Sequence, residues 1–181
     1  MVKSLLEGGA TVIATTSRLN ADATDMYQSL YGAYGARDSK LILFPFNMAS
    51  RTDVHDLIHH VYSVLQVDVD YVIPFAAAPQ LGNITDIGDR AELCTRMMLT
   101  NVVRLLGELV LRKSERCIYT RPALVLLPLS PNHGIMGGDG LYGEAKRGLE
   151  ALLNKWSSED WSDFLSITGI IDMYELLLQV L

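Results

Sequence analysis

Cysteine, basic charge and long apolar runs are all scarce in this sequence. Its 181 residues carry a net charge of −6 and two cysteines, Cys94 and Cys117, which lack the spacing of a metal site. The acidic balance argues against nucleic acid or an anionic membrane as a partner. No apolar run reaches the roughly 18 residues of a transmembrane helix. So few cysteines are typical of a reducing compartment, and we expect a cytoplasmic protein.

Strand and helix patterns alternate along the whole chain. Continuous apolar runs predict strands over residues 11–16, 41–46, 71–77, 123–129 and 164–171. Helical spacing of apolar residues predicts helices over residues 2–7, 23–34, 52–65, 91–112 and 141–156. Strands that are apolar throughout, rather than at alternate positions, are buried on both faces. We therefore predict an α/β fold, with a Rossmann-like, doubly wound parallel sheet covered by helices on both faces.

Ser130 follows the most apolar of these strands, at the end where such sheets bind ligands. A glycine-rich loop then leads to Tyr142, and Lys146 lies four residues later, on the same face of a helix. An ammonium group beside a phenol stabilises phenolate and lowers the phenol pKa. Tyr142 could then donate a proton to a carbonyl oxygen while hydride reaches the carbon, and the Ser130 hydroxyl could bind the same oxygen.

A tyrosine followed by lysine four residues later is also a common surface pair. Among the eight tyrosines, only Tyr142 has a lysine at this spacing. The apolar strand, the serine at its end and the glycine-rich loop before the helix favour the catalytic interpretation.

The end of the first predicted strand carries no acidic residue. A dinucleotide site selective for NAD usually places Asp or Glu there, whereas arginine suits the 2′-phosphate of NADP. Thr16, Ser17 and Arg18 stand at this position, so Ser17 and Arg18 are candidates for a 2′-phosphate clamp. A solvated arginine at the start of a loop is the competing interpretation.

Residues near other element ends supply weaker candidates. Asn47 could hydrogen-bond an adenine edge or be a turn asparagine. Ala76 and Ala77 could let a cofactor lie against the backbone, or could reflect tight packing. Asn101, within a long helix, could kink that helix or hold a water of a proton relay, or could be an ordinary helix-face amide.

The histidines do not predict a metal site. His55 and His59 have the spacing of metal ligands on a helix, but no third ligand is evident. With His60 they are expected on a solvated helix face, and we expect no bound metal. His133, in the loop after Ser130, could touch a substrate or simply fill the loop.

Together these motifs resemble the short-chain dehydrogenase/reductase superfamily and, more closely, the β-ketoacyl reductase domain of fungal-type fatty acid synthase alpha subunits. The resemblance covers residue 1 to about residue 169, and SPNHGxxGGDGxYxExK is far more specific than the general tyrosine–lysine pair. The other resembling segments are GGATVIATTSRL, YGAYGARDSKLILFPFN, YVIPFAA, RMMLTNVVRLLG and LEALLNKWSSEDW.

The resemblance implies NADPH-dependent reduction of a 3-oxoacyl chain, carried on acyl carrier protein, to the (R)-3-hydroxyacyl form. It implies that Tyr142 is the proton donor and that Lys146 lowers the Tyr142 pKa and binds the nicotinamide ribose. It also implies that Ser130 orients the carbonyl oxygen, that Asn101 supports a proton relay, and that residues 16–18 select NADPH. Other fatty acid synthase subunits are then expected partners, in a large cytosolic assembly.

Three departures from the family pattern stand out. The family's first strand and glycine-rich pyrophosphate turn are not found, so the strands at 11–16 and 71–77 are expected to lose the ladder partner between them. The segment Phe75-Ala76-Ala77-Ala78 stands where Asn-Ala-Ala-Gly is usual. Residues 172–181 form a divergent apolar tail, predicted as a short helix. We therefore expect a reductase domain over residues 1–171 that is truncated at its N-terminus.

Two alternatives stay open beside the fatty acid synthase reductase. The chain could be a catalytically silent structural or interaction segment that uses its apolar tail to pack on a partner. It could also be a ketoreductase of a polyketide pathway, with the same chemistry on another acyl chain.

Overall fold

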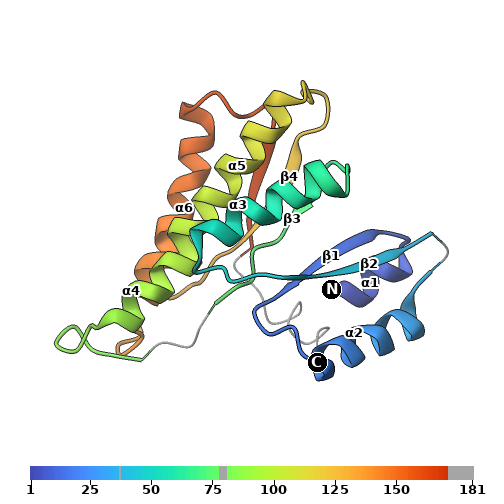
Figure 1. The fold of residues 1–181 in the computed structure, drawn as a ribbon. Coiled ribbons are helices and arrows are strands. Elements are labelled where there is room, and N and C mark those ends of the chain that lie inside the picture. Colours follow the sequence, from blue (N-terminus) through green and yellow to red (C-terminus); the bar gives the residue numbers. More distant parts are fainter. Residues whose placement is uncertain (37, 78–80, 171–181) are drawn as a thin grey trace. The chain divides into compact units, whose positions relative to one another are not determined.

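The structure, a computed structural model, describes residues 1–36, 38–77 and 81–170 (Figure 1). Contacts divide the chain into two compact units, one comprising Met1–Asn47 and the other Met48–Asp172, and each is described by itself. The predicted tail at residues 172–181 lies outside the described residues. Within the described ranges, no helix has both the length and the apolar character needed to cross a membrane.

The first unit combines a two-stranded parallel sheet with two helices. The strands β1 (Thr11–Thr16) and β2 (Lys40–Pro45) pair along their whole length. Helix α1 (Val2–Glu7) packs on β1, helix α2 (Ala21–Tyr34) packs on β2, and the two helices contact each other. The side-chain oxygen of Asn20 accepts a hydrogen bond from the first turn of α2, which caps that helix.

The second unit is built on a three-stranded parallel sheet in the order β3–β4–β5. Its strands are β3 (Tyr71–Val72), β4 (Ala123–Pro128) and β5 (Leu165–Ile170). Its α-helices are α3 (Arg51–His59), α4 (Asp89–Thr95), α5 (Asn101–Glu115) and α6 (Tyr142–Ser158). Helices α5 and α6 cover one face of the sheet, and α3 packs against α5 (Figure 1).

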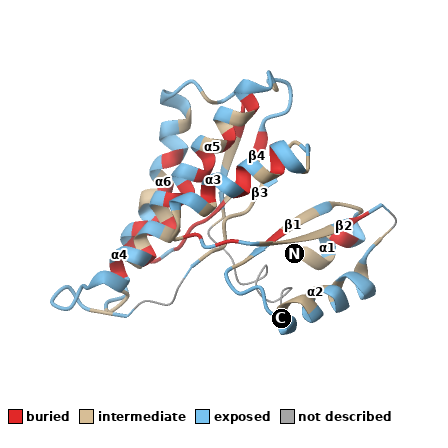
Figure 2. Cartoon of the chain, viewed as in Figure 1, coloured by how far each residue is buried: buried red, intermediate tan, exposed pale blue. Residues whose placement is uncertain are grey.

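The core of the second unit lies between β4 and these helices. Ala123, Val125 and Leu127 of β4 are fully buried, as are Leu109 of α5 and, almost completely, Leu149 of α6 (Figure 2). Strand β4 is the central strand of its sheet, so its sequence is apolar throughout rather than alternating. The parallel, buried strand predicted from the sequence is confirmed here.

A buried ion pair joins the end of α5 to the segment that enters β3, and the same lysine contacts the segment that enters β4. The Lys113 side chain is fully buried, and its Nζ lies 2.8 Å from the Asp68 carboxylate and 2.8 Å from the Arg121 carbonyl oxygen. The Tyr62 hydroxyl donates to Asp68 at 2.7 Å. Burial and the neighbouring Asp68 carboxylate raise the pKa of Tyr62 well above its usual range, so Tyr62 stays a hydrogen-bond donor. These contacts hold the segments that enter β3 and the central strand β4.

Both long helices of this unit contain a π-helical turn that the sequence reasoning did not predict. The helix expected over residues 52–65 is α3 followed by η1 (His60–Val64). The helix expected over residues 91–112 is α4, then η2 (Arg96–Thr100), then α5. A π turn accommodates one extra residue, and such turns are frequent at functional sites.

The described strands form two separate sheets, one in each unit. Among the described residues, β1 pairs only with β2, and β3 pairs only with β4. The expected loss of a ladder partner is therefore confirmed. The predicted extent of the strand at residues 71–77 was wrong, because β3 ends at Val72. A strand with one neighbour has fewer ladder bonds to hold it, and Pro74 has no amide to donate.

Candidate active site

Ser130 is held just beyond the end of β4. The Leu129 amide donates to the Ile170 carbonyl oxygen at 2.9 Å, which extends the β4–β5 pairing to the residue before Ser130. Ser130 is buried, and its Oγ accepts a hydrogen bond from the Asn132 amide at 3.1 Å. Because this contact uses an oxygen lone pair, it does not occupy the hydroxyl hydrogen of Ser130.

Tyr142 and Lys146 lie on the first turns of α6, on one face, as the sequence predicts. The Lys146 Nζ lies 5.6 Å from the centroid of the Tyr142 ring. Tyr142 packs against the buried cluster of Cys94, Met98 and Ala145, which orients the ring. The phenol and the ammonium group are therefore neighbours within a packed environment.

The Lys146 ammonium group also connects α6 to the end of β4. Its Nζ donates to the Pro128 carbonyl oxygen at 2.7 Å, two residues before Ser130. Lys146 is buried, and this burial lowers the pKa of its amine to about 8. The structure thus brings Ser130, Tyr142 and Lys146 to one place, where the end of β4 meets the start of α6.

Asn101 is completely buried at the start of α5, directly after the η2 turn. Its Nδ2 donates to the Met48 carbonyl oxygen at 2.6 Å, and its Oδ1 accepts from Arg104 at 2.7 Å. The η2 turn disturbs the helix at the position where the sequence suggested a kink. Between described side chains, no direct hydrogen bond joins Asn101 to Tyr142 or Lys146, so a relay through Asn101 stays a prediction.

The expected 2′-phosphate clamp lies at the end of β1, in the first unit. Thr16 Oγ1 accepts from the Arg18 amide and donates to the Arg18 carbonyl oxygen, both at 3.2 Å, which closes a tight turn. The Ser17 and Arg18 side chains are exposed. In the described part of the chain, no carboxylate forms an ion pair with Arg18, and its role in binding a cofactor stays a prediction.

The other expected cofactor residues are divided between the two units. Asn47 is exposed and follows β2 in the first unit. Ala76 and Ala77 follow β3 in the second unit, where Ala76 is half-buried and Ala77 exposed. Their roles stay predictions.

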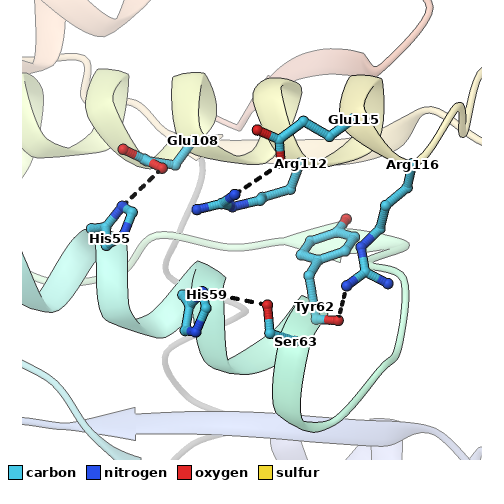
Figure 3. A network of polar contacts seen from close by, with 8 residues as sticks. All are labelled: His55, His59, Tyr62, Ser63, Glu108, Arg112, Glu115 and Arg116. Carbon is cyan, nitrogen blue, oxygen red and sulfur yellow. Dashed lines mark hydrogen bonds and ion pairs between the residues drawn. The ribbon is translucent and has the colours of Figure 1, made fainter.

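The histidine-bearing face of α3 and η1 is a network of ordinary polar contacts (Figure 3). The rings of His55 and His59 stack with centroids 6.2 Å apart. His55 contacts Glu108 at 3.2 Å, and His59 contacts Ser63 at 3.3 Å. Over the described ranges, His, Cys, Asp and Glu side chains form no group of three or more that could hold a metal ion.

His133 is tied to helix α6. Its Nε2 contacts Glu150 at 2.8 Å, and its Nδ1 contacts Arg147 at 3.0 Å. The loop that carries His133 also contains two residues that the sequence reasoning missed, Asn132 and Asp139, whose side chains hydrogen-bond each other at 2.7 Å. Their only signal in the sequence is their place in the SPNHG…GGDG motif, since Asn and Asp are common in turns.

Sequence comparison relates the chain to fungal fatty acid synthases. No protein-family model matches it. Over 94% of its length it is 52% identical to fatty acid synthase subunit alpha of Cochliobolus carbonum and 48% identical to that of Saccharomyces cerevisiae. The chain covers 11% and 9% of these relatives, respectively, so it spans about a tenth of their length. Its homologues are thus fatty acid synthase alpha subunits, as the sequence motifs indicated.

Comparison with solved structures gives the fold. An NADH-dependent reductase complexed with NAD matches 93% of the chain with a TM-score of 0.77 at 17% identity, and the match covers 69% of that reductase. A metagenomic short-chain oxidoreductase in complex with NADP matches 93% with a TM-score of 0.76 at 14% identity, and the match covers 72% of it. The chain therefore has the α/β, Rossmann-like fold of short-chain dehydrogenases/reductases, and the predicted fold class is confirmed.

Proposed function

We propose that this chain is the ketoreductase segment of a fatty acid synthase, reducing 3-oxoacyl-[acyl-carrier protein] to the (R)-3-hydroxyacyl form with NADPH. The observation that carries the proposal is the convergence of Ser130, Tyr142 and Lys146 where β4 meets α6. Homology to fatty acid synthase alpha subunits and the dehydrogenase/reductase fold support an oxidoreductase of this kind. Acyl carrier protein and the other synthase subunits are the proposed partners, in the cytoplasm.

The proposed chemistry places two donors on one carbonyl oxygen. Tyr142 donates its phenolic proton to that oxygen, and the Ser130 hydroxyl hydrogen-bonds the same oxygen as negative charge develops on it. Lys146, in its ammonium form, stabilises the phenolate that Tyr142 becomes. Asn101 supports the relay that returns a proton to Tyr142. Each role uses a buried or half-buried group, which lies just beyond the end of β4, on α5 or on α6.

The chain's residues fit part of a nicotinamide dinucleotide. When bound, NADPH supplies the hydride that reduces the carbonyl carbon. Ser17 and Arg18 would hold its 2′-phosphate, since the Arg18 guanidinium group is exposed at the end of β1. Lys146 would bind the nicotinamide ribose, and Asn47 the adenine edge.

The other residues proposed to bind the cofactor act through backbone shape or small size. Thr16 shapes the turn that presents Ser17 and Arg18. Ala76 and Ala77 would lie against the cofactor, because small side chains leave it room. The glycine turn that cradles a pyrophosphate is not found among the described residues. We propose that residues 1–171 nevertheless act as one cofactor-binding domain.

A second candidate function is a structural segment without activity. It is favoured by the absence, among the described residues, of a strand that pairs with β1 or β3 besides β2 and β4, and of a glycine turn for a pyrophosphate. Such a segment would keep Tyr142 and Lys146 but would bind no dinucleotide. A polyketide ketoreductase would differ only in the acyl chain that it accepts.

An NADPH titration followed by nicotinamide fluorescence, with NADH as the control, separates the first two functions. Saturable binding that prefers NADPH supports the reductase, and absence of binding to the folded chain supports the structural segment. Turnover is then measured with a short 3-oxoacyl substrate for Tyr142→Phe.

We expect Tyr142→Phe to lower kcat by about 100-fold or more, since it removes the proton donor. NADPH affinity should stay nearly unchanged. Tyr71→Phe is the matched control, because Tyr71 is 62% exposed and lies on β3. Full activity of Tyr142→Phe would refute the assigned role.

A further inference from the structure

The loop between Ser130 and Tyr142 is closed by one pair of side chains. Asn132 is buried, and its Nδ2 donates to Oδ2 of Asp139 at 2.7 Å. Its Oδ1 accepts from the Met136 amide at 3.1 Å. Both polar atoms of the Asn132 amide are therefore satisfied within the loop, and the contact with Asp139 draws its two ends together.

Asp139 also organises the first turn of α6. Its Oδ2 accepts from the Gly143 amide at 3.1 Å, and its carbonyl oxygen accepts from the Tyr142 amide at 3.1 Å. A carboxylate at a helix N-terminus satisfies amides that lack an intrahelical partner. The approach is close: a Cβ at Gly143 would lie 3.3 Å from Oδ2 of Asp139 and 3.2 Å from the Asn132 carbonyl oxygen. Asp139 thus fixes the backbone of Tyr142 directly.

The same pair reaches the serine at the other end of the loop. The backbone amide of Asn132 donates to Oγ of Ser130, so a series of hydrogen bonds runs from Ser130 through the backbone and side chain of Asn132 and through Asp139 to the backbone amides of Tyr142 and Gly143. The two residues whose hydroxyl groups are assigned to the substrate carbonyl, Ser130 and Tyr142, lie at the two ends of this series of hydrogen bonds.

A second backbone contact holds the loop from outside. The Gly82 amide donates to the Gly138 carbonyl oxygen, and the Gly140 amide donates to the Gly82 carbonyl oxygen, both at 3.0 Å. Gly138 and Gly140 have φ values of 79° and 62°, a region that favours glycine. The glycines on either side of Asp139 therefore allow a backbone conformation that directs the Asp139 carboxylate at Asn132.

We propose that Asn132 and Asp139 are positioning residues of the reduction: they set the distance between the Ser130 hydroxyl and the Tyr142 phenol. This inference rests on the proposed function. Neither side chain touches the substrate, and each acts through the residue beside it. Because both hydroxyl groups must meet one carbonyl oxygen, a displacement of about 1 Å at either end is expected to cost about 100-fold in rate.

The proposal is tested with the variants Asp139→Ala and Asn132→Ala, and the conservative variant Asp139→Asn serves as their comparison. The alanine variants remove the contact and should lower kcat by about 10- to 100-fold, with little change in the Kd for NADPH. Asp139→Asn keeps an oxygen that accepts from both partners and should retain kcat within about 3-fold. Asp160→Ala, on the surface, is the matched control.

Two further variants isolate the contact itself. The double variant Asn132→Ala with Asp139→Ala should lose little more than one single variant, because residues of one hydrogen-bond network are not additive. Asn132→Asp sets two carboxylates against each other and should lower kcat, and Asp139→Asn added to it should restore part of the loss. Additive losses, or equal losses in Asp139→Ala and Asp139→Asn, would overturn the proposal.

A spectroscopic measurement separates this inference from the proposed function. The Cζ resonance of Tyr142 in carbon-13-labelled protein, assigned with Tyr142→Phe, should move in Asp139→Ala and stay unchanged in Asp139→Asn. If the unsubstituted chain shows no turnover, the proposed function fails, and this resonance still decides whether Asp139 positions Tyr142. A resonance that is the same in the unsubstituted chain and in Asp139→Ala would refute the positioning role.

Discussion

The buried ion pair between Lys113 and Asp68 gives the sharpest test of the fold. Asp68→Asn keeps the shape of the side chain but removes the only charge shown to balance the Lys113 ammonium group within the described residues. The Lys113 side chain is 0% exposed and that of Asp68 is 17% exposed, so the cation would stay in a dry site. Breaking a buried pair on one side costs about 3–5 kcal/mol. Because Asp68 is partly open to water, we expect the lower end, about 3 kcal/mol.

Thermal and urea unfolding measure this loss. At about 2–4 °C per kcal/mol for a chain of this size, Tm should fall by roughly 6–12 °C. The matched control is Asp70→Asn. Asp70 pairs with Arg121 on the surface, with side chains 53% and 64% exposed, and such pairs contribute at most about 1 kcal/mol. Similar losses for Asp68→Asn and Asp70→Asn would refute the argument from burial.

The pH dependence checks the same prediction. Burial by itself raises the pKa of Asp68, but hydrogen bonds from Lys113 and Tyr62 outweigh burial and hold it below its ordinary value. A carboxylate with a depressed pKa stabilises the fold above its unfolded pKa of about 4 and loses that contribution as pH falls through the folded pKa. The difference in unfolding free energy between the unsubstituted chain and Asp68→Asn should therefore shrink below about pH 4.

Two predictions concern the cofactor and the lysine. Arg18→Ala should weaken NADPH binding by about 10-fold or more and leave NADH binding nearly unchanged, since it removes a charge for the 2′-phosphate; titrations with both nucleotides measure this, and equal losses would contradict the clamp. The rate should fall as pH rises through about 8, because burial lowers the pKa of Lys146 to about 8 and the neutral amine cannot stabilise phenolate. A pH–rate profile that stays flat to about pH 9.5 would show that the Lys146 charge is not required.

The sequence predicts the architecture well where a local pattern, such as a continuous apolar run or helical spacing, determines the structure by itself. Strand β4 is apolar at every position and its residues are buried or half-buried, so its place in the middle of its sheet could be inferred directly. The Tyr142–Lys146 pair follows from helical spacing, and the structure places both side chains as expected. Residues 11–16 were predicted to the residue as β1.

The rest depends on contacts that no local pattern records. The length of β3 is set by its partners, so the apolar run at residues 71–77 overstates it. The carbonyl oxygens of Pro128 and Met48, which bind Lys146 and Asn101, are backbone groups that a sequence does not single out. Asn132 resembles any turn asparagine until the structure shows its amide bound to Asp139.

The η2 turn lets its helix carry one residue more than a regular α-helix would. Its final hydrogen bond runs from the Asn101 amide to the Arg96 carbonyl oxygen, five residues back. Because a π turn accommodates one extra residue, deleting one residue between Arg96 and Thr100 would restore a regular α-helix and leave the residues after it nearly in phase. The same deletion in the regular part of α5 would turn everything after it by about 100°, since a helix has about 3.6 residues per turn. A single-codon deletion within η2 should consequently be less harmful than one farther along α5.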